Sequence, residues 1–186
     1  MKTIKELCKE IKGIYNIDGR DNTEITGISA DSRKIEKGFL FVCIAGVHVD
    51  GATFAGQAVE KGAVAVLTNK HLDLPLEITQ ITVPDIHAAL EDIVPYFYDY
   101  PGKKMRMIGV TGTNGKTTTS HIIAHILREA GYHVVVIGTI HALIDDKELE
   151  IHNTTPDVVE LQALLALMYA EGMEYVVMEV SSHALA

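Results

Sequence analysis

The first half of the chain alternates short apolar runs with segments in which apolar residues recur at helical spacing. This alternation predicts helices over residues 3–11, 52–61 and 85–98, and strands over 25–32, 39–45, 63–68 and 78–83. Gly62 is expected to end the second of these helices. Strands interleaved with helices are typical of an α/β unit.

Residues 98–104, Tyr-Asp-Tyr-Pro-Gly-Lys-Lys, form a polar, turn-rich break, and we place a domain boundary there. The pattern then restarts. It predicts strands over 106–111, 133–139 and 175–180, helices over 117–130 and 157–170, and a hairpin over 140–151. Gly131 and Gly172 are expected to end these helices, and Asp157 to cap the second.

The predicted fold class is therefore α/β. A small α/β domain over residues 1–100 precedes a mostly parallel α/β domain over 103–186 that begins with a strand and a helix. A doubly wound domain begun near residue 103 needs on the order of 100 to 150 residues. We therefore expect the second domain to be incomplete at its C-terminus and the chain to be the N-terminal portion of a longer protein.

The segment Met107-Ile-Gly-Val-Thr-Gly-Thr-Asn-Gly-Lys-Thr-Thr-Thr119 runs from a predicted strand through a glycine-containing loop into a helix. Free N–H groups at the start of that helix suit a polyphosphate, Lys116 adds a positive charge, and the Thr117 hydroxyl can bind Mg²⁺. Val110 stands where the usual phosphate-loop spacing has its first glycine, which leaves Gly112-x-x-Gly115-Lys116-Thr117. The alternative is an ordinary strand-to-helix turn, which has no need of a lysine followed by three threonines. We expect this loop to bind the polyphosphate of a nucleotide together with Mg²⁺.

Composition limits the partners. A net charge of −9 argues against a general nucleic-acid binder, and the charged start of the chain is not a signal peptide. No apolar run approaches the roughly 18 residues that cross a bilayer, so we expect no membrane insertion. Cys8 and Cys43 lie far apart and are expected to be reduced thiols of a cytoplasmic protein.

Three motifs follow one another: Thr111-Gly-Thr-Asn-Gly-Lys-Thr-Thr118, Asn153-Thr-Thr-Pro-Asp157 and Met178-Glu-Val-Ser-Ser-His183. With Asp31-Ser-Arg33, Gly38-x-Leu-Phe-Val42 and Gly46-x-x-x-Asp-Gly51, they make the chain resemble the Mur ligase family of bacterial cell-wall synthesis over nearly its whole length. Within that family the resemblance is to the members that add the third amino acid of the peptidoglycan precursor. It implies an ATP-dependent amide ligase: the carboxylate of UDP-MurNAc-L-Ala-D-Glu becomes an acyl phosphate, which the amine of diaminopimelate or lysine attacks.

The resemblance also implies roles for particular residues. Lys116 and Glu179 would be catalytic, and Thr117 and Glu179 would hold Mg²⁺. ATP would bind residues of the loop, namely Gly112, Thr113, Asn114, Gly115, Lys116, Thr117 and Thr118. The UDP-sugar would contact Ala30, Ser32, Val47, His48, Val49, Asn153, Thr154, Thr155 and Ser181. We expect such a chain to bind ligands without turnover, because the family's lysine that is carbamylated to bind metal and its third domain would follow residue 186.

Other readings stay open. The chain could be a nucleotide-binding module, an unrelated P-loop NTPase, or a P-loop amide ligase of another substrate class. His121 and His125 have metal-ligand spacing, but we interpret them as a partly exposed helix face opposite a buried stripe of Ile122, Ile123, Ile126 and Leu127. Asp145 and Asp146 are interpreted as a hairpin turn, His183 is assigned no catalytic role, and an exposed sheet edge is expected near residues 176–180.

Overall fold

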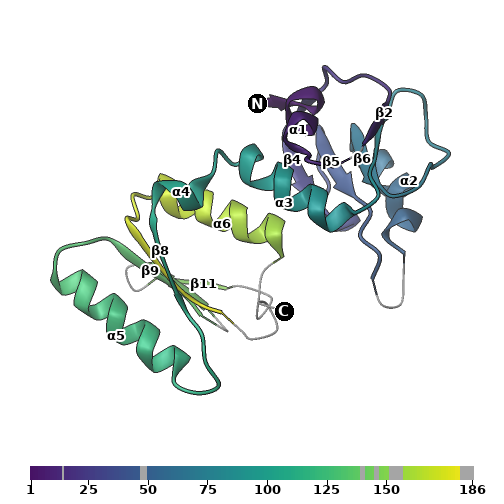
Figure 1. The fold of residues 1–186 in the computed structure, drawn as a ribbon. Coiled ribbons are helices and arrows are strands. Elements are labelled where there is room, and N and C mark those ends of the chain that lie inside the picture. The colour runs from purple at the N-terminus through teal and green to yellow at the C-terminus, as the bar shows by residue number, and fades with distance from the viewer. Residues whose placement is uncertain (14, 47–49, 139–140, 145–146, 151–156, 181–186) are drawn as a thin grey trace. The chain divides into compact units, whose positions relative to one another are not determined.

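The computed structural model describes residues 1–13, 15–46, 50–138, 141–144, 147–150 and 157–180. The chain divides into two compact units, Met1–Phe97 and Tyr98–Ala186. Each unit is built on its own sheet with helices against it (Figure 1).

The first unit contains a five-stranded sheet in the order β2-β7-β6-β5-β4. Its strands are β2 (Asn16–Asp18), β4 (Gly27–Ser29), β5 (Phe39–Val42), β6 (Ala65–Thr68) and β7 (Thr79–Thr82). The strands from β4 to β7 are parallel, and β2 adds antiparallel to β7 at one edge. A separate short pair joins β1 (Lys2–Thr3) to β3 (Glu24–Ile25).

The helices of this unit are α1 (Ile4–Glu10), α2 (Ala55–Glu60) and α3 (Ile86–Phe97), with 3₁₀ turns η1 (Ser32–Lys34) and η2 (Gly51–Phe54). Thr3 and Glu6 form a capping box at the start of α1, which satisfies two backbone donors of that end. Phe41 and Cys43 of one sheet face pack against Ala55 and Ala58. Alternate positions of β5 point to the opposite face, where its residues are also fully buried. The sheet is thus covered on both sides.

Three expectations for this half need correction. The apolar run 25–32 is not one strand: it pairs as β3, breaks at Thr26, pairs again as β4, and turns into η1 at Ser32. The run 39–45 ends as a strand at Val42. The strand β2 was not expected, because its largely exposed, polar residues carry no buried face and it is held by its pairing with β7.

The second unit contains a five-stranded sheet in the order β11-β10-β9-β12-β8. Its strands are β8 (Arg106–Val110), β9 (Val134–Ile137), β10 (His141–Ile144), β11 (Lys147–Glu150) and β12 (Tyr175–Glu179). Parallel pairing joins β12 to both β8 and β9, and the expected hairpin is present as the antiparallel pair β10–β11. Residues 145–146, assigned to its turn, lie outside the described residues.

Helices cover both faces of this sheet (Figure 1). On one face α5 (Lys116–Glu129) packs through Ala124 against Val134, Val136 and Val177. On the other face α6 (Val158–Ala170) packs through Leu165 and Met168 against Val135, Ile137 and Val176. Neighbouring residues of β9 and β12 therefore serve opposite faces, as the two-residue period of a strand requires. The segment expected as a break contains a one-turn helix, α4 (Pro101–Lys104).

Two expectations for the second half are wrong. Ile122 and Ile126 do not belong to a buried stripe, because their exposed fractions are 54% and 61%. Ala124 is the residue that faces the sheet, with Ile123 and Leu127 half-buried beside it. The strand at 175–180 is not an edge: β12 lies between β9 and β8, and β8 is the outer strand.

Candidate phosphate-binding site

The loop between β8 and α5 is shaped by two glycines. Gly112 has a φ of +146° and Gly115 a φ of +79°, a region that residues with a side chain rarely adopt. A Cβ on Gly115 would meet no heavy atom within 4 Å, so the backbone conformation, not lack of space, requires glycine there. This turn directs the chain from the end of β8 into the first turn of α5.

The N-terminus of α5 offers unsatisfied donors. Its N-cap residue is Gly115, which supplies no side-chain hydrogen bond, and the first turn contains no acidic residue. The early N–H groups of a helix lack partners within the helix and carry a partial positive charge. Residues 111–115 and 117–119 are exposed, so these donors are accessible to an anion.

The Lys116 ammonium lies over this loop. It donates a hydrogen bond to the carbonyl oxygen of Gly112 at 2.7 Å, which folds the half-buried side chain back across the glycine turn. Its charge therefore stands beside the helix N-terminus. An anion bound there would find a cation and backbone donors on the same side.

Thr117 and Glu179 come together although they are distant in sequence. The Thr117 hydroxyl donates to Glu179 Oε2 at 3.2 Å. The β8–β12 register pairs Glu179 with Val110, so the carboxylate lies at the strand end from which the loop departs. Hydroxyl and carboxylate oxygens are ligands that Mg²⁺ accepts. Among the residues that the structure describes, no group of three or more His, Cys, Asp or Glu could hold a metal ion.

The expected UDP-sugar contacts are only partly described. Ala30 is half-buried, and Ser32 is buried with its hydroxyl donating to Gln57 Oε1 at 2.7 Å. Gln57 was not anticipated, because nothing in the sequence distinguishes it from other polar residues of its helix. Val47, His48, Val49, Asn153, Thr154, Thr155 and Ser181 lie outside the described residues.

The two ends of the segment 47–49 are held together. Ala45 and Asp50 form an isolated antiparallel bridge, and Gly51 N–H donates to the Ile44 carbonyl at 3.0 Å. Lys70 donates to the Asp50 carboxylate at 2.5 Å. This hydrogen bond, with one from Ala52 N–H, lowers the pKa of Asp50. Lys70 was also missed, because it follows β6 and shares no motif with the segment.

A parallel strand, a loop with two positive-φ glycines, a lysine over that loop and an uncapped helix start together define a phosphate-binding α/β protein of the P-loop class. Comparison with known proteins narrows this class. The Mur ligase middle domain matches residues 110–186, and the catalytic domain of the Mur ligase family matches residues 24–98. The chain belongs to the Mur ligase family.

Similar proteins agree with this assignment. The chain is 44% identical over 185 residues to the UDP-N-acetylmuramoyl-L-alanyl-D-glutamate–2,6-diaminopimelate ligase of Syntrophomonas wolfei, covering 100% of this chain and 37% of the relative. It is 45% identical over 166 residues to the ligase of the same name from Bacillus cereus, covering 89% of this chain and 33% of that one. A solved structure of a ligase of this name matches with a TM-score of 0.79 and 30% identity, covering 99% of this chain and 37% of that chain.

The chain thus spans little more than a third of the length of these relatives. Within the described residues, no helix is both long and apolar enough to cross a membrane.

Proposed function

We propose that this protein is an ATP-dependent amide ligase that adds diaminopimelate, as the third amino acid, to UDP-MurNAc-L-Ala-D-Glu. The observation that carries the proposal is 44% identity along the whole chain to a relative named for that reaction. The loop geometry supports the ATP part of the proposal, because it combines accessible helix N–H groups with Lys116. Lysine in place of diaminopimelate is the alternative third residue.

In this proposal the second unit binds the nucleotide. N–H groups of residues 116–118 and the loop residues Gly112 to Gly115 receive the phosphates, and Lys116 exchanges its bond to the Gly112 carbonyl for a phosphate oxygen. Phosphoryl transfer depends mainly on positioning and charge neutralisation, which these groups supply. Thr117 and Glu179 would hold Mg²⁺, which when bound offsets the negative charge of the phosphates. The proposal also places the protein in the cytoplasm.

The first unit is proposed to recognise the UDP-sugar. Ala30 and residues 47–49 would contact it, with Asn153, Thr154, Thr155 and Ser181 contributing from the second unit. The Ser32 hydroxyl already donates to Gln57, so its remaining capacity is to accept a hydrogen bond. The domain assignment, residues 1–100 for substrate and 103–186 for ATP, is part of the same proposal.

Calorimetric titration of the chain tests this proposal. We expect UDP-MurNAc-L-Ala-D-Glu and Mg-ATP to bind separately, and Lys116→Met to abolish ATP binding only. Lys5→Met is the matched control, since it removes the same charge from an exposed ion pair with Asp21 in the first unit. Failure of the muramoyl nucleotide to bind would refute the substrate assignment and leave a nucleotide-binding module. Unchanged ATP binding by Lys116→Met would refute the phosphate loop.

A further inference from the structure

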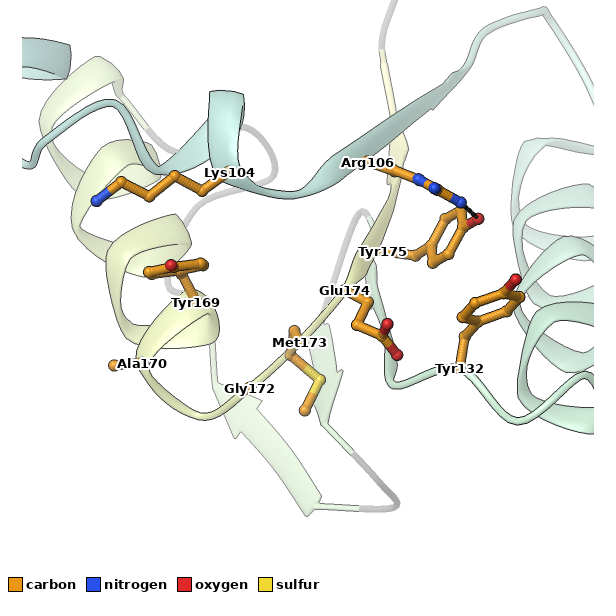
Figure 2. Close-up of a pocket in the computed structure, with 9 residues that line it drawn as sticks. All are labelled: Lys104, Arg106, Tyr132, Tyr169, Ala170, Gly172, Met173, Glu174 and Tyr175. Carbon is orange, nitrogen blue, oxygen red and sulfur yellow. Dashed lines mark hydrogen bonds between the residues drawn. The ribbon is translucent and has the colours of Figure 1, made fainter.

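The second unit has a pocket at the end of its sheet opposite the phosphate loop. The pocket has a volume of about 580 Å³ and lies beside the residues that begin β8 and β12 and end α6 (Figure 2). Arg106 begins β8, whereas the phosphate loop follows Val110 at its other end. Four strand steps of about 3.3 Å separate these ends by roughly 13 Å, so the pocket is distinct from the candidate phosphate site.

The lining of this pocket combines rings and charges. The residues used in the argument are Lys104, Arg106, Tyr132, Tyr169, Glu174 and Tyr175. Figure 2 shows Lys104 with Tyr169 on one side, Arg106 with Tyr175 and Tyr132 on the other, and Glu174 between them. Three tyrosines and two cations around one volume are suited to a ligand that has both a flat apolar body and a charge.

Each cation is held against a ring. The Lys104 ammonium lies 5.0 Å from the centre of the Tyr169 ring, and the Arg106 guanidinium lies 5.3 Å from that of Tyr175. Arg106 also donates a hydrogen bond to the Tyr175 hydroxyl, and the rings of Tyr132 and Tyr175 are 4.9 Å apart. Arg106 has five N–H donors, so this bond leaves most of its fork available to an oxyanion.

The sign of the charge favours an anion. Among the described residues that line the pocket, Glu174 is the one acidic residue, against two basic residues, Lys104 and Arg106. One of its oxygens already accepts from the His133 N–H at 3.2 Å. A cationic ligand would meet a like charge on either side of the pocket, whereas a carboxylate or phosphate on the Arg106 side would meet the donors of Arg106.

We propose that the Arg106 side of this pocket binds a small flat anion, an aromatic ring system bearing one carboxylate or phosphate, with its oxyanion on Arg106 and its ring against Tyr132 and Tyr175. The volume lies in the range of small-molecule pockets, which is roughly 300–1,000 Å³. The described residues that line the pocket all belong to the second unit, between residues 104 and 175. The proposal does not rest on the ligase function.

The probe for the test is 2-naphthoate, with 2-naphthylmethanol as its neutral and 2-naphthylmethylammonium as its cationic counterpart. Binding to the chain is followed by NMR line broadening of the naphthyl protons of each probe. We expect naphthoate to bind about tenfold more tightly than the alcohol, and the ammonium compound to bind more weakly still, because charge-assisted hydrogen bonds depend on the carboxylate.

Variants locate the binding. Arg106→Met is expected to weaken naphthoate binding about tenfold, and Lys104→Met, on the other side of the pocket, to weaken it less. Lys103→Met is the matched control: its ammonium lies 4.1 Å from the Tyr100 ring and does not line the pocket, so no change is expected. Tyr175→Phe keeps the ring and removes the hydroxyl to which Arg106 donates, so it should retain binding. Retained binding would show that a substitution in the lining does not by itself unfold the pocket.

Three outcomes would overturn the proposal. Equal affinity for the acid and the alcohol would show that the carboxylate does not contribute to binding and would refute the oxyanion site. Equal weakening by Lys103→Met and Arg106→Met would indicate a nonspecific charge effect. Loss of naphthoate binding in Lys116→Met would assign the probe to the phosphate loop instead, whereas unchanged binding in that variant supports the pocket even if the ligase proposal fails.

Discussion

The most discriminating perturbation of the phosphate loop is an added methyl group at Gly115. Alanine there would have to adopt a φ of +79°, at a cost of about 1–2 kcal/mol. Alanine also lowers the conformational entropy of the unfolded chain, which offsets about 0.4–1 kcal/mol of this cost. Since no heavy atom lies within 4 Å of the new Cβ, no steric term is added, and the net loss is about 1 kcal/mol.

Gly131 provides a matched control at the other end of the same helix. Its φ is +87°, and an added Cβ there also meets nothing within 4 Å. Gly115→Ala and Gly131→Ala should therefore lower the thermal midpoint of the second unit by a similar amount, about 4–8 °C for a domain of this size. The two variants differ in one respect: Gly115 orients the N–H groups at the start of α5, and Gly131 does not.

Calorimetric titration with Mg-ATP separates the two effects. We expect Gly115→Ala to bind ATP at least about tenfold more weakly, equivalent to losing one charge-assisted hydrogen bond, and Gly131→Ala to bind as the parent chain does. If both variants bind ATP alike while both lose stability, the left-handed conformation of Gly115 does not orient the phosphate-binding amides, and the reasoning is refuted.

Three further predictions concern stability and reactivity. Burial raises the pKa of the Cys8 thiol to about 11 and that of Cys43 to about 12, so neither should react with a disulfide reagent at pH 8 until the chain is unfolded; rapid reaction in native buffer would contradict this. The hydrogen bond from Arg33 lowers the pKa of Asp31, so its contribution to stability is present above about pH 4 and is lost as pH falls through the lower folded pKa. The free energy of unfolding in urea should therefore fall less between pH 6 and pH 3 for Asp31→Asn than for the parent chain. An equal fall in both chains would count against a stabilising Asp31–Arg33 pair. Ile126→Ser should change the free energy of unfolding by less than about 1 kcal/mol because the side chain is 61% exposed, and a core-sized loss of about 3 kcal/mol would mean that this face is covered.

Local signals predicted much of the fold. Asp157, expected as a cap, accepts from the Glu160 N–H at 2.8 Å and marks the start of α6. A helix start of this kind can be recognised from the sequence because capping depends on residues three apart. In the site, Thr117 and Glu179, which the resemblance paired as Mg²⁺ ligands, lie within hydrogen-bond distance of each other, and their role is a proposal.

What the sequence could not predict depends on tertiary arrangement. Helix α5 has apolar residues on more than one side, so its periodicity alone did not say that Ala124 faces the sheet and Ile126 faces solvent. The pocket around Arg106 draws its lining from α4, β8, α6, β12 and the connections beside them, and its residues form no motif. Strand β2 is stabilised by its partner and not by its own hydrophobicity.

The pairing of β8 with β12 has a consequence for how the phosphate site is assembled during folding. Among the described strands β8 pairs with β12 alone, and their register runs from Arg106–Tyr175 to Val110–Glu179. Because side chains alternate faces, a slip of one residue would move Glu179 by about 3.3 Å and turn its carboxylate away from Thr117. A chain with every site residue intact but this register shifted would be compact and unable to form the pair, so misalignment of a single outer strand is a route to inactive protein that no substitution in the loop would reveal.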